Sequence, residues 1–452
     1  MNLLPQNNFY KIILKVALPA IAGLSTQMVV SLVDTAMVGR LEEATYALAA
    51  MGIGVLATWA LISFFSSLAT GIHVIVARKF GQQDFISCGL TLNNSLLIAL
   101  ALGVIVAATG VFFAHEIAHL FAADDIVGGY AGEYIFYRFL GIPFFLISVS
   151  YRGFFFGINK TKIFMFSGAL TNLLNIIFNY FFIYGAFGFP RMGLAGAGLG
   201  STLATIFDCL FYLSIILLPA YRKTYQVFKN IKIDKNIILA IIKISLPVSF
   251  QNALILVGFL SFVSITGLIG IIEQASTQAV ISTLFISFLP CFGFGIAVQT
   301  LVGNNLGAGK YLLAKIYGFE TAKVATIYTI LLGMVFIIIP NYVLLIITTN
   351  QSIIEVAIPV LRIAGFAQIF YGIGIVLANG LQAAGRTVYV MNSEIITNLL
   401  LFVPLSYFLG VYLDLGLYWA WVALPFYIVS YSVIIFLKFN SKSWYKKIPV
   451  EN

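Results

Sequence analysis

The sequence predicts an all-α polytopic membrane protein with twelve transmembrane helices in two pseudo-symmetric six-helix lobes. Three observations support this prediction: 61% of the 452 residues are hydrophobic and only 9% are charged, long apolar stretches recur along the chain, and short motifs repeat in order. Soluble domains contain about 25% charged residues, so a water-soluble fold is excluded. The apolar stretches are continuous and do not alternate over roughly ten residues, which disfavours a β-barrel.

The spans follow from the apolar stretches between polar breaks, because a helix needs about twenty apolar residues to cross a hydrocarbon layer roughly 30 Å thick. No basic region precedes the first stretch, so we expect it to be a retained helix and not a cleaved signal peptide. The twelve predicted spans are 12–38, 46–76, 91–114, 134–157, 163–187, 193–219, 238–269, 275–302, 319–347, 354–383, 388–411 and 415–437.

The distribution of cations predicts that both termini are cytoplasmic, because cytoplasmic loops retain positive charge. All of the 25 lysines and arginines are assigned to one side except Arg40, Arg138, Arg191 and Arg362. The formal net charge of +9 is therefore spread over several short loops. Membrane lipid, and no nucleic acid, is the expected partner of these cations. We expect an integral protein of a bacterial inner membrane.

An internal repeat relates the two halves of the chain. Lys15–Pro19 resembles Lys243–Pro247, and similar pairs follow in the same order: 74–81 with 300–307, 171–174 with 397–400, and 192–195 with 415–418. An even number of spans per repeat gives both halves the same topology. The predicted domains are an N-terminal lobe (1–220), a cytoplasmic linker (221–237), a C-terminal lobe (238–437) and a cytoplasmic tail (438–452).

Two such lobes with a cleft between them are typical of secondary carriers, which open to each side of the membrane in turn. The sequence contains no Gly-x-x-x-x-Gly-Lys-[Ser/Thr] nucleotide loop and no soluble segment long enough for an ATPase domain. The energy for transport is therefore expected to come from an ion gradient. A channel is disfavoured because no ring of pore-lining groups is evident.

Asp34 is the strongest candidate for the residue that binds the coupling ion. An ionisable side chain deep in a membrane span is energetically costly, so its presence indicates a function. Gln27 and Ser31 lie on the same helical face. An alternative is that Asp34 caps a neighbouring helix end. If the lobes enclose Asp34, desolvation disfavours its charged form, so its protonation would depend on the side to which the cleft opens.

A second polar stripe is formed in the fifth span by Asn172, Asn175 and Asn179, whose amides offer donors and acceptors. A carboxylate that faces these amides would form a proton site, although asparagines in membranes also serve helix packing. For Asp208, structural pairing and function stay equally open. Glu394 is expected to be an interfacial group.

His115-Glu-Ile-Ala-His119 matches the His-Glu-x-x-His pattern of zinc proteases. These are two of only three histidines in the chain, and no third ligand motif accompanies them. An amphipathic interfacial helix explains the segment better, and no metal site is expected; His73, the remaining histidine, is expected to be structural. A membrane metalloprotease remains a remote alternative, and we expect no enzyme activity.

Several segments together resemble the multidrug and toxic compound extrusion (MATE) family: Val33–Leu41, the Leu-Pro openings of both halves, Asn172–Asn179, Gly193–Gly198 and Leu301–Gly309. The resemblance covers about residues 10–437. It implies a twelve-helix fold and export of cationic or amphipathic compounds in exchange for protons or sodium ions. A lipid-linked oligosaccharide flippase of related fold is the main alternative, disfavoured by the near absence of arginine in the apolar runs.

Within that family the chain is similar to the DinF-like branch, which implies that Asp34 is the coupling residue and that Asn175 and Asn179 are its partners. Many relatives have an aspartate where Asn179 stands, and the acidic residues of NorM-like members in helices seven and ten have no counterpart here. The resemblance therefore favours a proton over sodium as the coupling ion, with no other cofactor.

Substrate-cavity residues are predicted from residue type, because aromatic, methionine and amide side chains bind varied amphipathic cations without fixed geometry. The expected substrates are small cationic or amphipathic molecules, and the expected oligomeric state is a monomer. The candidate cavity residues besides Gln27 are Met28, Gln251, Asn252, Gln278, Tyr371 and Asn398.

Overall fold

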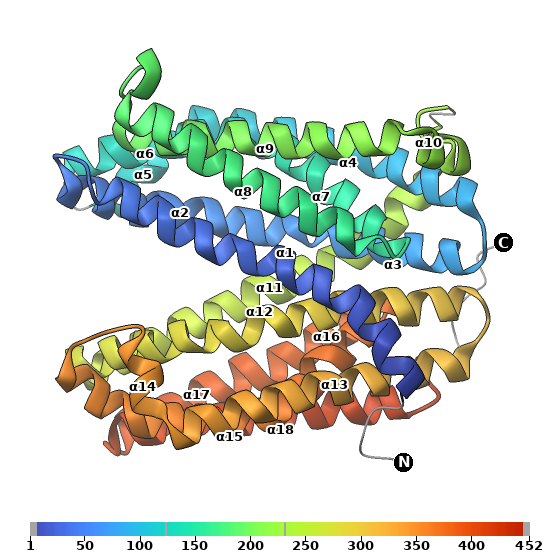
Figure 1. Cartoon of the computed structure of the whole chain (residues 1–452). Coiled ribbons are helices and arrows are strands. Elements are labelled where there is room, and N and C mark those ends of the chain that lie inside the picture. The colour runs from blue at the N-terminus through green and yellow to red at the C-terminus, as the bar shows by residue number, and fades with distance from the viewer. Residues whose placement is uncertain (1–6, 123, 230–231, 446–452) are drawn as a thin grey trace. The chain divides into compact units, whose positions relative to one another are not determined.

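The computed structural model describes residues 7–122, 124–229 and 232–445, and within these ranges every regular element is helical (Figure 1). In the described part, 11 helices are long and apolar enough to cross a membrane. A twelfth span results if α6 (Asp125–Leu140) and α7 (Ile142–Gly157), which are bent by 47° relative to each other, count as one. The all-α membrane fold with up to twelve spans is thus confirmed.

The chain divides into two compact units, residues 22–249 and residues 1–21 with 250–452. Both divisions fall inside long helices, α1 (Asn7–Val38) and α11 (Lys235–Ile269), shortly after Pro19 and Pro247. Proline removes a helical hydrogen bond and weakens the helix at that point. The sequence predicted a different division, with a linker at 221–237, all of α1 in the N-terminal lobe and α11 from residue 238 onward in the C-terminal lobe. We call the two groups the 22–249 unit and the 250–452 unit.

The 22–249 unit has a core of buried aromatic and aliphatic side chains that includes Phe154, Phe155 and Tyr212. Besides the parts of α1 and α11 and the pair α6 and α7, its elements are α2 (Ala44–Ser66), α3 (Leu68–Gly81), α4 (Phe85–Phe112), α5 (Ala114–Phe121), α8 (Thr161–Tyr184), η1 (Ala186–Gly188), α9 (Gly193–Leu217) and α10 (Pro219–Tyr225). Helix α8 packs on α9, α7 packs on α3 and α4, and α6 packs on α2, α5 and α9.

Besides the parts of α1 and α11, the elements of the 250–452 unit are α12 (Ile271–Gly307), α13 (Tyr311–Ile338), α14 (Pro340–Leu345), α15 (Gln351–Ala383), α16 (Thr387–Glu394), η2 (Ile395–Phe402), α17 (Val403–Tyr407), η3 (Phe408–Tyr412) and α18 (Gly416–Asn440). The long helix α15 packs against α12, α13 and α18. One part of the core includes Phe262, Phe402 and Trp421. The eleventh predicted span coincides with a region that contains two π-helical stretches, η2 and η3.

The repeat seen in the sequence is also present in the backbone of two pairs of turns. In the turn between α3 and α4, the N–H groups of residues 82, 83 and 84 donate to the carbonyls of 78, 80 and 79. The same three bonds recur in the turn between α12 and α13, 226 positions further along. Gln83 and Gly309 occupy the matching left-handed position, with φ of 61° and 71°.

The turns between α7 and α8 and between α15 and α16 form a second matched pair. Residues 158, 159 and 160 donate to 154, 156 and 155, and the equivalent bonds recur 226 positions later. Asn159 and Gly385 take the left-handed conformation there, which these two residue types adopt most readily. The two halves therefore share turn geometry as well as motif order.

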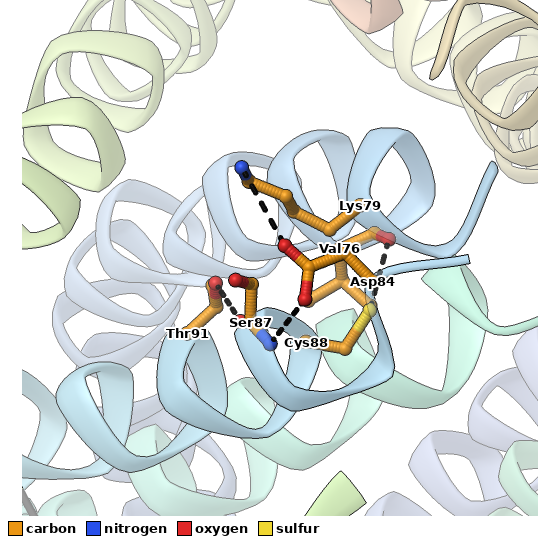
Figure 2. A network of polar contacts seen from close by, with 6 residues as sticks. All are labelled: Val76, Lys79, Asp84, Ser87, Cys88 and Thr91. Carbon is orange, nitrogen blue, oxygen red and sulfur yellow. Dashed lines mark hydrogen bonds and ion pairs between the residues drawn. The ribbon is translucent and has the colours of Figure 1, made fainter. Parts of the chain in front are cut away.

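Side chains stabilise the turn between α3 and α4, as Figure 2 shows. Asp84 is the N-cap of α4 and accepts a hydrogen bond from the backbone N–H of Ser87 at 3.0 Å. Lys79, in the last turn of α3, lies 4.0 Å from the Asp84 carboxylate. The thiol of Cys88 contacts the Val76 carbonyl at 3.7 Å. The Asp84 cap satisfies a backbone N–H group at the start of α4 that has no partner within the helix.

Candidate functional site

The candidate site of the 22–249 unit is centred on the carboxylate of Asp34 in α1. Asp34 is half-buried, and its Oδ1 accepts a hydrogen bond from Nδ2 of Asn179 in α8 at 2.8 Å. Within the described part of the chain, no lysine, arginine or histidine lies within ion-pair distance of Asp34. The carboxylate is therefore held by an uncharged amide and is not neutralised by a cation.

The hydrogen bonds continue from Asn179 into the helix pair α8 and α9. Asn179 Nδ2 also donates to Oδ1 of Asn175 at 3.1 Å, and Asn175 Nδ2 donates to the hydroxyl of Ser201 in α9 at 2.9 Å. Asn175 and Asn179 lie four residues apart, so they share one face of α8. We call Asp34, Asn179, Asn175 and Ser201 the Asp34 chain. Three helices contribute to it.

A glycine in α9 makes room for Asn179. A Cβ added to Gly200 would lie 2.3 Å from Asn179 Oδ1 and 2.9 Å from its backbone nitrogen, so only glycine allows α8 and α9 to approach this closely. Asn179 Oδ1 is buried and has no hydrogen-bond partner among the described residues. An unpaired buried acceptor is unfavourable, and this one lies in the side-chain amide that contacts Asp34.

Two residues of α6 lie near Asp34, and no sequence pattern links either of them to it. Arg138 and Tyr134 both interact electrostatically with the carboxylate, and Arg138 Nε is buried without a hydrogen-bond partner among the described residues. The order of the predicted spans places Arg138 toward the side of the membrane opposite the termini, but it does not predict that Arg138 lies near Asp34. Its proximity to Asp34 depends on how α6 packs in the unit, and no local motif reports that packing.

The other predicted members of the N-terminal polar site lie outside the Asp34 chain. Gln27 and Ser31 are exposed, although they share a helical face with Asp34. Asn172 is half-buried, and its Nδ2 has no hydrogen-bond partner among the described residues. The side chain of Met28 lies outside those that the structure describes. Sequence spacing thus predicted the pair Asn175 and Asn179 better than the wider stripe.

The remaining substrate candidates all belong to the 250–452 unit, and they do not share one environment. Gln251 is buried and accepts a hydrogen bond from Gln382 at 3.1 Å. Asn252 is half-buried and Gln278 is exposed. The ring of Tyr371 packs on that of Phe288 with centroids 5.0 Å apart, and Asn398 is fully buried.

Glu394 corrects an expectation from the sequence. It was expected at the membrane interface, but it is only 2% exposed. Asn398 Nδ2 donates to Glu394 Oε1 at 3.2 Å, and the hydroxyl of Tyr427 donates to the same oxygen at 2.5 Å. Its place near the start of the eleventh predicted span, 388–411, led to that expectation, whereas the helix turns its carboxylate into the unit.

Asp208 has a structural environment of its own. Its Oδ1 accepts hydrogen bonds from the hydroxyls of Ser167 and Thr171, the latter at 3.1 Å. Both donors lie on α8, so the carboxylate of α9 links the two helices. Ser201, seven residues before Asp208 in the same helix, accepts its hydrogen bond from Asn175 and belongs to the Asp34 chain.

The His-Glu-x-x-His segment forms the short helix α5, which packs on α6. Cβ atoms added to Gly132 and Gly128 would lie 2.3 and 2.4 Å from Nδ1 of His115 and His119, so both rings fill notches on α6. His119 Nδ1 also lies 3.6 Å from Asp125. In the described part of the chain, no group of three or more His, Cys, Asp or Glu residues is arranged to hold a metal ion.

Two long segments of the chain match a known protein family. The MatE family model matches residues 19–181 and 247–408, which is more than half of the sequence. The chain belongs to the MatE family. The two matched segments begin at Pro19 and Pro247, so they correspond to the two repeats.

Curated relatives match nearly the full length of this MatE protein. It is 26% identical over 453 residues to the probable multidrug resistance protein NorM of Thermotoga maritima, with 99% of this chain and 96% of the relative covered. The probable multidrug resistance protein YoeA of Bacillus subtilis is 22% identical over 86% of this chain and 84% of its own length.

Solved structures share the fold of this MatE protein at 20% identity. One is described as the outward-facing conformation of a multidrug resistance MATE family transporter of the MOP superfamily, with a TM-score of 0.87, 95% of this chain covered and 94% of that chain. A MOP superfamily transporter from Pyrococcus furiosus has the same TM-score and coverage. The first matched segment contains Asp34, Asn175 and Asn179, whereas Ser201 lies outside both matched segments.

Proposed function

We propose that this MatE family membrane protein exports cationic or amphipathic small molecules in exchange for protons by alternating access. The names of its curated relatives, probable multidrug resistance proteins, support the substrate class. The observation that carries the proposal is the hydrogen bond from Asn179 to Asp34, a carboxylate inside a membrane helix that no cation neutralises among the described residues.

The chemistry of the Asp34 chain supports proton exchange. An ionised carboxylate is disfavoured where it is removed from water, and it is favoured by hydrogen-bond donors and nearby positive charge. Asn179 supplies such a donor, and Arg138 supplies charge without a direct ion pair. Small changes in the packing of α1 against α8 therefore alter the balance between the protonated and ionised forms. Such a group binds a proton in one conformation and releases it in the other.

The orientation of the amides supports a proton over sodium. Hard cations bind oxygen ligands, yet Asn179 presents its Nδ2, a donor, to Asp34. Its own oxygen points toward Gly200. Asn179 also replaces the aspartate that a two-carboxylate site would need. The Asp34 chain therefore offers few oxygen ligands to a metal cation and a suitable environment for one exchangeable proton.

We further propose that the protein is a monomer in a bacterial inner membrane with both termini on the cytoplasmic side. The bias of lysine and arginine toward one side of the predicted spans supports this orientation. Each copy of the protein contains the complete Asp34 chain within its own 22–249 unit, so a second copy is not needed to complete that site.

Efflux from proteoliposomes tests the proposed coupling. The protein is reconstituted with a fluorescent organic cation such as ethidium, and either a pH gradient or a sodium gradient is imposed. We expect the pH gradient to drive dye movement at constant sodium. Movement driven by sodium alone, or by neither gradient, would contradict proton antiport.

A further inference from the structure

The 250–452 unit contains a buried acidic residue that the proposed function does not use. Glu394 is the last residue of α16, and the π-helical stretch η2 begins at the next residue. It is 2% exposed and lies in a helix that is apolar enough to span the membrane. π-Helices are rare and occur frequently at functional sites. The position of Glu394 is therefore unusual in both burial and backbone geometry.

The groups around Glu394 are polar but uncharged. Tyr427 of α18 and Asn398 of η2 both donate hydrogen bonds to Oε1. Tyr371 of α15 and Tyr431 of α18 also lie close enough to interact electrostatically with the carboxylate. No lysine, arginine or histidine among the described residues lies within 4.0 Å of it.

A second buried glutamate in the same unit differs from Glu394, because a lysine neutralises its carboxylate. Glu320 of α13 is 5% exposed, and Lys323 donates to it at 2.7 Å. Removal from water disfavours an ionised carboxylate, and a nearby positive charge offsets that cost. Glu394 has two uncharged donors and no such cation, so its ionised form is less well stabilised than that of Glu320.

We propose that Glu394 is a second proton-exchange site, located in the 250–452 unit and separate from Asp34. In one conformation the carboxylic acid keeps its proton and the site is neutral. In the other, the acid dissociates into a carboxylate and a proton, and the donors Tyr427 and Asn398 stabilise the anion. The role of this site in transport rests on the proposed proton exchange, whereas its proton binding is measurable without transport.

The arrangement of Asn398 favours a proton over a metal cation. Its Nδ2 faces Glu394, and its Oδ1 faces α11, where a Cβ added to Gly258 would lie 1.9 Å from it. That oxygen is buried without a hydrogen-bond partner among the described residues. The amide therefore presents a donor to the carboxylate, which suits an anion that gains and loses a proton and does not supply a cation ligand.

The repeat shows that this site is not a duplicate of the Asp34 chain. Asn398 corresponds to Asn172, and by the same offset Glu394 corresponds to Gly168. By the offset of the Leu-Pro openings, Asp34 corresponds to Phe262, which is buried in the core. Each unit thus places its unneutralised carboxylate at a position where the other unit has an uncharged residue.

Infrared difference spectroscopy of the purified full-length protein during a pH titration tests the proposal, with the proton itself as the probe. We expect carbonyl bands of protonated carboxylic acids that disappear at alkaline pH, one of which belongs to Glu394 and is distinct from any band of Asp34. Glu394→Gln should remove that one band, whereas the matched control Glu320→Gln should retain it. A spectrum that Glu394→Gln leaves unchanged, or a Glu394 band that no pH within the stable range removes, would overturn the proposal.

Two further variants separate this proposal from the proposed function. Asp34→Asn should retain the Glu394 band, so a failure of Asp34 to couple transport would leave the second site standing. Tyr427→Phe keeps the carboxylate but removes one donor, and it should shift the pH at which the band disappears. If the band of a folded Tyr427→Phe protein disappears at the same pH as in wild type, the role of Tyr427 is contradicted. The Tyr427→Phe variant also provides the test of the proposal if Glu394→Gln does not fold.

Discussion

Asn179 donates a hydrogen bond to Asp34 at 2.8 Å, although the two residues are 145 positions apart in the chain. The contact joins the first helix to α8 and aligns one amide with one carboxylate oxygen. Because Asn179 also donates to Asn175, its orientation is fixed by two acceptors. Under the proposed mechanism, this single side chain couples the protonation of Asp34 to the packing of α1 against α8.

Replacing Asn179 should impair coupling more than replacing its neighbour on the predicted stripe. Asn179→Leu removes the donor to Asp34, and we expect pH-driven efflux to fall at least about tenfold, which corresponds to about 1.4 kcal/mol. Asn172→Leu, which lies outside the Asp34 chain, should retain most of the activity. Efflux rates in proteoliposomes measure both, and equal losses in the two variants would contradict the distinction.

Gly200 is expected to tolerate no side chain. In Gly200→Ala the new methyl group would meet both the side chain and the backbone of Asn179, and overpacking of this kind destabilises by about 1–3 kcal/mol. Gly52→Ala is the matched control, because a Cβ at Gly52 would have no atom within 4 Å. Thermal unfolding in detergent should show a lower Tm for Gly200→Ala alone, and similar Tm values would refute the close approach.

Much of the fold and three of the four residues of the Asp34 chain could be predicted from sequence, because they depend on local patterns; Ser201 could not. Apolar length predicts spans, and i, i+4 spacing predicted that Asn175 and Asn179 share a face. Gln27 and Ser31 share a face with Asp34 by the same argument, yet they are exposed. The neighbouring helices determine which face of a membrane helix is buried. The spacing of residues along one helix does not predict where those neighbours lie.

Asp208 should differ from Asp34 in its effect on transport. Its carboxylate links α9 to Ser167 and Thr171 of α8, so Asp208→Asn weakens helix packing while leaving the Asp34 chain intact. We expect a loss of stability of about 1–3 kcal/mol and an unchanged pH profile of efflux. A pH profile altered as in an Asp34 variant would assign Asp208 to the coupling machinery.

The His-Glu-x-x-His segment is expected to bind no zinc. Its two histidine rings fill notches at Gly128 and Gly132, so their contribution is to packing of α5 on α6. Purified protein should contain no stoichiometric zinc by elemental analysis, and treatment with EDTA should leave efflux unchanged. One zinc ion per chain that is lost in His115→Ala would contradict this packing role.

The burial of Glu394 illustrates what sequence could not reveal. Its partner Asn398 lies four residues away and is visible as a helical neighbour, but Tyr427 is 33 positions distant. The sequence placed Glu394 near the start of a predicted span, where an interfacial group is expected. The packing of α18 on η2, which buries its carboxylate, is not visible in the sequence.

The pH-driven efflux of an organic cation by Asp34→Asn, compared with wild type in the same proteoliposomes, tests the central claim most directly. The substitution preserves size and removes the titrating group, so the account predicts that an imposed pH gradient no longer accelerates efflux. Acceleration equal to that of wild type, with the same dependence on pH, would contradict the assignment of Asp34 as the coupling residue.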